Sequence, residues 1–287
     1  MTPTVALPSL DARRYAETFG VFLEHSREYA LMVDELVRVI HAHLPPGFRM
    51  LDIGAGTGCL IRSLAERPEV KLAGYTAYEP NPRHVDALRA VLAHLPVASR
   101  LHPEGISEAT RITGGFDLVL FSHSLYWMPD PAAALLLAAR SLTPDGVAIA
   151  LLQGPYGVHA LFNLFEDHYR RLTPMLQNNR MSSHEQVAVL RARGVEPEVR
   201  MLKTAMDLTG LFDACHADEL SEFISFLLQL EFGSLPQRLQ QDIIQYIEGG
   251  CIIAGDKLLW YLPNASVVVR RAAIPAAQSR DDGGQVP

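Results

Sequence analysis

The sequence MLDIGAGTG, residues 50–58, decides the fold. It joins an apolar, acid-containing run to three glycines at alternating positions, and a helix-like stretch follows from Cys59 to Ala65. Glycines allow a sharp backbone turn and a close approach to a ligand, because any side chain there would collide with it. The stretch therefore predicts a buried strand at Phe48–Ile53, a tight ligand-binding turn and a helix.

Strand-like and helix-like segments alternate outward from this turn. Residues 12–43 have the periodicity of one or two amphipathic helices, which Pro45 and Pro46 end. Strands that alternate with helices indicate a parallel, doubly wound α/β sheet buried on both faces. We expect strands at Lys71–Tyr78, Arg100–His102, Phe116–Ser122 and Val147–Leu152, and helices at Asn81–His94 and Pro131–Leu142.

The second half of the chain is less regular, and it contains neither an internal repeat nor a clear linker. The final residues, 276–287, are polar and contain glycine, which predicts a disordered tail. We expect helices at Val158–Leu172, Ser182–Gly194 (capped by Ser183), Asp218–Glu231 and Gln237–Ile247, a strand at Glu198–Met206, and a closing hairpin of Lys257–Tyr261 and Ser266–Arg270.

The composition favours a soluble, cytoplasmic protein. The 287 residues carry a net charge of −7, which argues against a nucleic-acid binder, because such proteins need a concentrated basic surface. The three cysteines are too few and too widely spaced for a disulfide framework or a metal site. No signal peptide and no apolar stretch of about 20 residues is visible, so we expect no membrane association.

The spacing of the glycines distinguishes two kinds of ligand. A dinucleotide-binding turn would have its third glycine at position 59, where this chain has Cys59. Here the third glycine comes one residue earlier, at Gly58. This form, after a strand that ends in an acid, resembles motif I of class I methyltransferases that use S-adenosylmethionine (SAM). A nicotinamide-dependent oxidoreductase on a similar sheet is the alternative from a different class.

Glu79 lies at the end of the second predicted strand, directly after Tyr78, and precedes Pro80. A carboxylate offers two oxygens at a spacing that suits both hydroxyls of a ribose. Because it comes one strand–helix unit after the glycine turn, Glu79 predicts that a nucleoside lies across the carboxyl ends of the strands.

The loop FSHSLYW, residues 121–127, follows the fourth predicted strand. In methyltransferases of this class, residues at this place lie beside the methyl group. We expect His123 and Tyr126 to face the substrate and Trp127 to pack the loop. The alternative is that Tyr126 and Trp127 only anchor the following helix.

Together with these motifs, the N-terminal segment resembles histamine N-methyltransferase. The resemblance is carried by YAETF at residues 15–19, FLEHSRE at 22–28, LYW at 125–127 and TAMD at 204–207, and it spans roughly residues 15–269. It implies one methyltransferase domain over residues 1–275, with a helical cap at 1–45, a SAM-binding core at 46–155 and substrate-cap elements at 156–275.

The resemblance also implies roles for individual residues, with Glu28 contacting an amine acceptor. His123 stands where the family has a glutamine, and Pro263 or Asn264 where it has a substrate-binding asparagine. We expect catalytic roles for Glu28, His123 and Tyr126; cofactor contacts from Asp52, Gly54, Ala55, Gly56, Gly58, Glu79, Pro80, His84 and Ser122; and acceptor contacts from Tyr15, Phe19, Phe22, Glu28, His123, Tyr126, Phe162 and Tyr169.

The predicted reaction is transfer of the SAM methyl group to a small molecule, with S-adenosylhomocysteine (SAH) as the other product and no metal. An amine or nitrogen heterocycle is the expected acceptor, while oxygen or carbon acceptors of a specialised metabolite remain alternatives. A non-catalytic SAM-binding protein is a further alternative. We expect a monomer or a homodimer.

Overall fold

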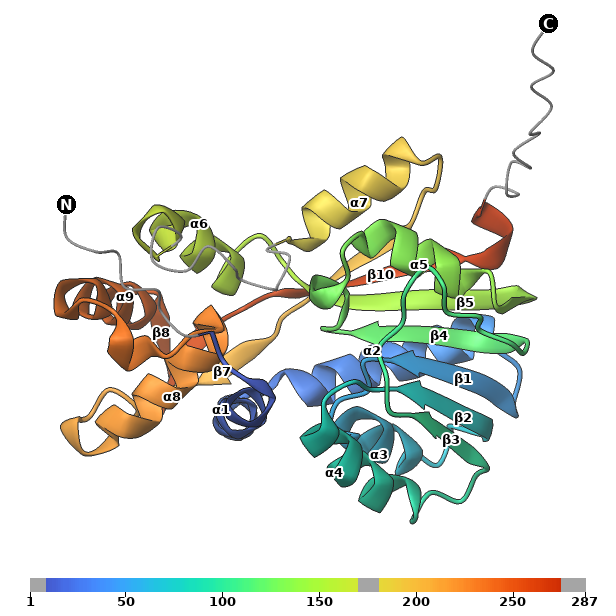
Figure 1. Cartoon of the computed structure of the whole chain (residues 1–287), viewed down its shortest axis with the longest axis horizontal. Coiled ribbons are helices and arrows are strands. Elements are labelled where there is room, and N and C mark those ends of the chain that lie inside the picture. The colour runs from blue at the N-terminus through green and yellow to red at the C-terminus, as the bar shows by residue number, and fades with distance from the viewer. Residues whose placement is uncertain (1–8, 170–180, 275–287) are drawn as a thin grey trace, which may run out of the picture.

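The computed structural model describes residues 9–169 and 181–274, and its centre is a seven-stranded sheet (Figure 1). The strands lie in the order β3-β2-β1-β4-β5-β10-β6. The first five are parallel, whereas β10 is antiparallel to both of its neighbours. Their bounds are Phe48–Ile53 (β1), Leu72–Tyr78 (β2), Ser99–His102 (β3), Phe116–Ser122 (β4), Leu142–Gln153 (β5), Glu198–Leu202 (β6) and Asn264–Arg270 (β10).

Both faces of this sheet are buried, as an alternating α/β sequence predicts. Along β5, Val147, Ile149 and Leu151 join the core on one face, while Ala148 and Ala150 join the core on the other. The helices on the first face are α2 (Glu28–His43), α3 (Cys59–Ala65) and α4 (Pro82–Leu92), and those on the second are α5 (Pro131–Ala139) and α7 (Ser183–Ala192). This confirms the doubly wound fold.

A cap lies beside the carboxyl ends of the parallel strands (Figure 1). It contains a second sheet in the order β7-β9-β8, and it has a hydrophobic core of its own that includes Phe223, Ile243 and Trp260. Its elements are α1 (Ala12–His25), α6 (Val158–Tyr169), β7 (Ala205–Asp207), α8 (Ala217–Leu228), α9 (Gln237–Gly249), β8 (Cys251–Ala254) and β9 (Lys257–Tyr261).

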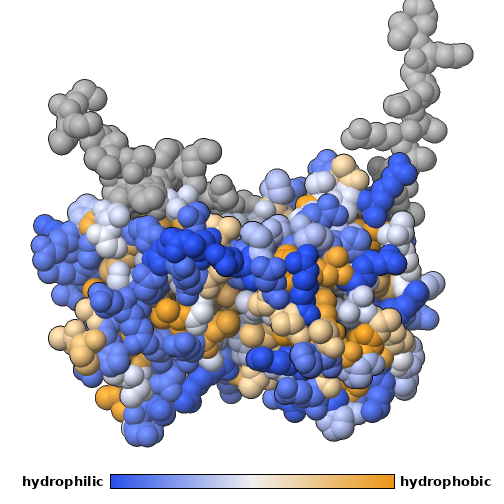
Figure 2. Space-filling view, turned by 60° about the horizontal axis from the view of Figure 1, so that its bottom comes forward, coloured by the Kyte–Doolittle hydropathy of each residue, from blue (hydrophilic) through white to orange (hydrophobic). Residues whose placement is uncertain are grey.

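Ion pairs of Arg14 and a hydrogen bond of His25 fasten α1 to the rest of the cap. Arg14 contacts Glu222 at 2.7 Å and Glu231 at 2.8 Å, and His25 lies 3.0 Å from Glu219. At the start of α1, the Ala12 carbonyl accepts a hydrogen bond from the Asn81 side chain at the N-terminus of α4. The helix therefore bridges the cap and the sheet, and Figure 2 shows apolar residues among hydrophilic ones along the hollow where the two meet.

Three expectations about the second half are wrong. The predicted hairpin does not form, because β9 pairs with β7 and β8 whereas β10 pairs with β5 and β6. The predicted strand at 198–206 is two strands in different sheets, β6 and β7. Ser182, and not Ser183, caps α7, because Glu185 completes a capping box with it.

The helix expected at 131–142 ends at Ala139, and Leu142 already belongs to β5. No helix within residues 9–169 and 181–274 is long and apolar enough to cross a membrane. The expected tail at 276–287 lies outside the described residues.

Candidate active site

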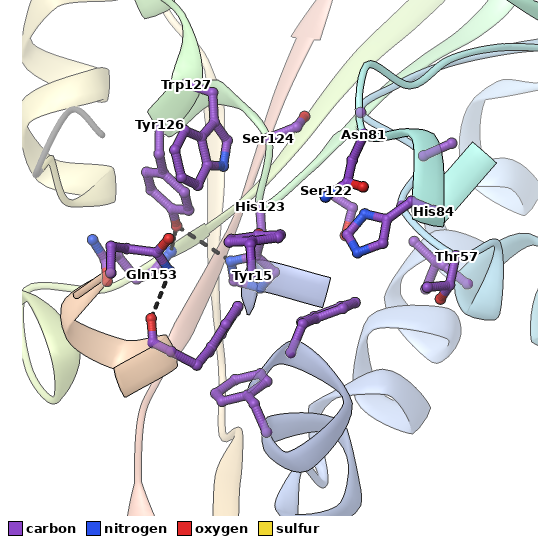
Figure 3. A pocket seen from close by; sticks show the side chains of 18 of the residues that line it. Tyr15, Thr57, Asn81, His84, Ser122, His123, Ser124, Tyr126, Trp127 and Gln153 are labelled. Carbon is purple, nitrogen blue, oxygen red and sulfur yellow. Dashed lines mark hydrogen bonds between the residues drawn. The ribbon is translucent and has the colours of Figure 1, made fainter. Parts of the chain in front are cut away.

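A cavity of about 500 Å³ lies at the carboxyl ends of β1, β2 and β4, between the sheet and the cap (Figure 3). The chain adds β2 and β3 on one side of β1 and then returns to place β4 on the other side, so the strand order reverses at this point. Open α/β sheets bind ligands at such points. Four acids line the cavity, and no lysine or arginine does so among the described residues; the acids are Asp11, Glu28, Asp52 and Glu79.

The glycine turn has a backbone that other residues rarely adopt. Gly54 and Gly56 have φ angles of +75° and +59°. A Cβ on Gly54 would lie 2.4 Å from the Cβ of Ser124, whereas a Cβ on Gly56 would meet no atom within 4 Å. Gly54 therefore allows close packing of the turn against the loop after β4, and Gly56 leaves open space for a ligand.

Gly58 has a different environment from the two glycines before it. A Cβ at this position would lie 2.7 Å from a methyl group of Leu88 on α4, and Gly58 is not among the cavity-lining residues. This glycine allows α3 and α4 to pack closely. A direct cofactor contact by Gly58 stays a prediction.

Glu79 is buried at the end of β2, with 5% of its surface exposed, and it lines the cavity. Its two carboxylate oxygens accept hydrogen bonds from the backbone N–H groups of Gly56 and Asn81, each at 2.8 Å. These bonds orient the carboxylate and join it to the glycine turn. The Nδ1 atom of His84 lies 3.7 Å from Glu79, and the His84 Nε2 atom has no hydrogen-bond partner in the described parts of the chain.

Asp52 supplies a second buried carboxylate, from within β1. Its Oδ2 atom accepts a hydrogen bond from the Tyr75 hydroxyl at 2.8 Å, and its Oδ1 atom has no hydrogen-bond partner among the described residues. Burial raises the pKa of Asp52 to about 7, and the nearby charge of Glu79 adds to the rise. The Asp52 carboxyl group therefore binds a proton more tightly than an exposed aspartate does. A cationic ligand beside it would favour its ionised form.

We expect Asp52→Asn to change how stability depends on pH in the SAM-free protein. Because the pKa of Asp52 is higher in the folded state, the folded protein binds this proton more tightly, and wild-type stability falls as pH rises from about 4 to 7. As the pH rises from 5 to 8, the free energy of unfolding of the variant should increase relative to that of wild type by on the order of 2–3 kcal/mol. Urea unfolding at each pH measures this quantity.

The control for this prediction is Asp86→Asn, at an exposed position on α4, which should follow the wild-type pH profile. If the Asp52→Asn profile also runs parallel to the wild-type profile, Asp52 does not hold a proton in the folded protein.

The other end of the cavity brings together three residues from distant parts of the chain. Glu28, at the start of α2, is 4% exposed, and its Oε2 atom accepts a hydrogen bond from Asn264 Nδ2 at 2.7 Å. Nε2 of His123 lies 3.3 Å from the same amide nitrogen and 3.8 Å from Glu28 Oε1. No lysine or arginine forms an ion pair with Glu28 in the described parts of the chain.

His123 has a backbone φ of +51°, which is unusual for a residue other than glycine and is found mainly where surrounding structure enforces it. Its Nδ1 atom lies 3.3 Å from the Tyr126 hydroxyl, which also accepts a hydrogen bond from the Gln153 backbone (Figure 3). Tyr126 belongs to a 3₁₀ helix, Leu125–Trp127, directly after the loop. The tyrosine thus orients the histidine toward Glu28.

Aromatic side chains from α1 and α8 form the wall between the two ends. Tyr15 and Phe19 lie with ring centroids 5.6 and 5.5 Å from His84, and Phe22 lies 4.6 Å from Phe226. All five rings line the cavity. Apolar rings of this kind exclude water and can interact with a cation.

The structure places almost all the sequence-predicted site residues around one cavity. The exceptions are Gly58, described above, and Tyr169, whose side chain lies outside the described part of the structure. The lining residues that were predicted are Tyr15, Phe19, Phe22, Glu28, Asp52, Gly54, Ala55, Gly56, Glu79, Pro80, His84, Ser122, His123, Tyr126 and Phe162.

Sequence reasoning missed several residues that also line the cavity. Tyr29 and Phe226 gave no motif signal, because a helical aromatic residue is more often core than pocket. Asn264 was only one of two possible positions. Other missed lining residues include Asp11, Thr57, Cys59, Asn81, Gly105, Ile106 and Gln153.

These features suit SAM, a nucleoside with a positively charged sulfonium and an amino-acid end. The open space above Gly56 can admit a ligand, and Glu79 lies where a carboxylate can accept both ribose hydroxyls. The orphaned Oδ1 of Asp52 can face an ammonium group. A cavity lined by acids and without described lysine or arginine side chains matches a cationic cofactor.

Comparisons with known proteins agree with this fit. A family model described as a methyltransferase domain matches residues 23–194. The chain is 25% identical over 231 residues to carnosine N-methyltransferase 2 of Gallus gallus, which covers 72% of this chain and 70% of that protein. It is 30% identical over 130 residues to the ubiquinone biosynthesis O-methyltransferase of Xanthomonas oryzae, covering 45% and 53%.

Among solved structures, the YcgJ protein of Bacillus subtilis superposes with a TM-score of 0.55 at 16% identity, covering 83% of this chain and 97% of that one. That likeness supports the fold. The family match spans more than half of the chain and includes the glycine turn, Glu79 and the loop after β4. The chain therefore belongs to the methyltransferase-domain family and is a SAM-dependent methyltransferase.

Proposed function

We propose that this enzyme methylates a nitrogen atom of a small amine or nitrogen heterocycle. The observation that carries the proposal is Glu28, a buried carboxylate that faces the cavity and has only Asn264 and His123 as polar partners among the described residues. A buried carboxylate without a full cation beside it is costly. An N–H group or a cationic group of the acceptor would supply the missing partner.

Each residue at this end has a distinct task in the proposed reaction. SAM supplies a methyl group that is already electrophilic, so the protein needs no nucleophile of its own. Glu28 and Asn264 hold the acceptor, and the fixed orientation of both groups favours alignment of the acceptor nitrogen. Nε2 of His123, beside Glu28, can take up a proton from the acceptor nitrogen.

The aromatic wall complements these polar groups. Phe19, Phe22 and Phe162 line the cavity from α1 and α6 and present apolar surface to a bound acceptor. They keep water away from the reacting atoms, and their ring faces favour a positively charged group.

The charge of the cavity leads to a prediction about the class of acceptor. A carboxylate on the acceptor would be buried among acids, without any described arginine or lysine to pair with it. We therefore expect amines to be used at least about 100-fold better, by kcat/KM, than their α-carboxylated counterparts, since an unpaired buried charge costs several kcal/mol. Histamine against histidine, and tyramine against tyrosine, are suitable matched pairs.

The measurement is product formation from SAM carrying a deuterated methyl group, followed by mass spectrometry. Tyramine carries both an amine and a phenol, so fragmentation of its product locates the methyl group. Label on nitrogen and preference for the amine of each pair support the proposal. Label on oxygen, or equal use of the carboxylated compounds, overturns it.

A further inference from the structure

Tyr29 lines the cavity, and its hydroxyl has no hydrogen-bond partner among the described residues. Tyr29 follows Glu28 on the first turn of α2, and its ring packs against the core cluster that contains Met32 and Leu60. By contrast, the hydroxyl of Tyr75 donates to Asp52. Tyr29 is only partly buried and lines the cavity, so its hydroxyl is available to a ligand there.

The surroundings of Tyr29 keep its hydroxyl protonated. Burial raises the pKa of Tyr29 well above its usual value, and the nearby groups of Glu28, Cys59 and Asp52 raise it further. At neutral pH the side chain is therefore a hydrogen-bond donor. Because Glu28, Cys59 and Asp52 all line the cavity, Tyr29 lies where the glycine turn and α2 meet.

The orientation of the bound cofactor follows from the residues on either side of Glu79. With the ribose at Glu79, the cavity extends on one side to Gly105 and Ile106, after β3, and on the other to Asp52 and Tyr29. The sulfonium joins the ribose to the amino-acid chain, and its methyl group has to face Glu28. The amino-acid end therefore lies on the same side as Glu28, a step that rests on the acceptor end proposed above.

Two polar groups at that end, Asp52 and Tyr29, are placed to meet the two charges of an amino acid. Asp52 is 2% exposed and lines the cavity, and its Oδ1 atom has no partner within residues 9–169 and 181–274, so it can accept a hydrogen bond from the ammonium group. We propose that the Tyr29 hydroxyl donates a hydrogen bond to the carboxylate of the cofactor's amino-acid end. Adjacent residues on the first turn of α2 then serve both ligands, Glu28 the acceptor and Tyr29 the cofactor.

The test compares two ligands by isothermal titration calorimetry of the full chain. SAH has the amino-acid end, whereas 5′-methylthioadenosine has the same nucleoside without it. Tyr29→Phe keeps the ring and removes only the hydroxyl, so we expect SAH to bind about tenfold more weakly and methylthioadenosine to change by less than about twofold. Tyr261→Phe, at a half-exposed position on β9 outside the cavity, should leave both affinities unchanged.

Either of two results overturns the assignment. If Tyr29→Phe binds SAH as well as wild type does, the hydroxyl makes no contact that matters. If SAH and methylthioadenosine are weakened equally, the effect comes from the shape of the site and not from the carboxylate. Because no acceptor is present in this assay, its outcome is separate from whether nitrogen is the methylated atom.

Discussion

A Glu79→Gln variant should bind SAH about 100-fold more weakly than the wild-type protein. The Glu79 carboxylate accepts hydrogen bonds from Gly56 and Asn81 and still has lone pairs for two ribose hydroxyls. An amide turns one of these acceptors into a donor, which then faces an N–H or O–H group. The variant loses a charge-assisted hydrogen bond and leaves a buried polar group unsatisfied. Together these changes cost roughly 2–3 kcal/mol of binding free energy.

Calorimetry with SAH and methylthioadenosine checks this prediction. Both ligands carry the ribose, so both should be weakened, unlike the pattern expected for Tyr29→Phe. Glu69→Gln is the matched control, because Glu69 is exposed and precedes β2, at the amino ends of the parallel strands and away from the cavity. Wild-type affinity in Glu79→Gln would mean that the nucleoside is bound elsewhere.

The second large effect is expected at the acceptor end, from Glu28→Gln. The variant should lose about 100- to 1,000-fold in kcat/KM for the preferred amine, because a buried charge pair or charge-assisted hydrogen bond is worth about 2–5 kcal/mol. Its affinity for SAH should stay within about threefold of wild type, since Glu28 faces the acceptor and not the nucleoside. Steady-state kinetics and calorimetry on the same preparation separate the two quantities.

Glu24→Gln, at an exposed position on α1, is the control and should retain wild-type kinetics. Equal losses of SAH affinity and of amine methylation in Glu28→Gln would show that Glu28 supports the whole cavity. In that case the carboxylate would not be the group that selects the acceptor.

The sheet could be predicted from sequence because local signals and the fold agree there. The strand at Phe48–Ile53, the helix at Cys59–Ala65 and the strand at Phe116–Ser122 have the expected bounds. Each is a strongly apolar or glycine-bounded segment, and its hydrophobic pattern agrees with its place in the sheet. The same agreement located Glu79, because it directly follows β2, the strand that comes after β1 and the glycine turn.

The cap could not be predicted in the same way, because its strands pair over long distances. The chain leaves the main sheet after Leu202, and Thr204 is held by hydrogen bonds to Leu262 and Asn264, 58 and 60 residues away. Those contacts separate β6 from β7 and β9 from β10. No local pattern shows which sheet a short alternating segment joins.

The side chains at the acceptor end of the cavity could not be predicted together either, because they come from distant parts of the chain. Glu28, His123 and Asn264 come from α2, the loop after β4 and the start of β10, and only the folded chain brings them together. Tyr29 lies one residue from a predicted site residue and was still missed. Helical periodicity tells which residues share a face, and it does not tell which face meets a ligand.

A crystal structure with SAH and a methylatable amine tests the central claim most directly. The account predicts that the Glu79 carboxylate lies within hydrogen-bond distance of both ribose hydroxyls and that the amine nitrogen lies between the SAH sulfur and the group formed by Glu28, His123 and Asn264. An amine bound away from Glu28, or a ribose bound by residues other than Glu79, would contradict it.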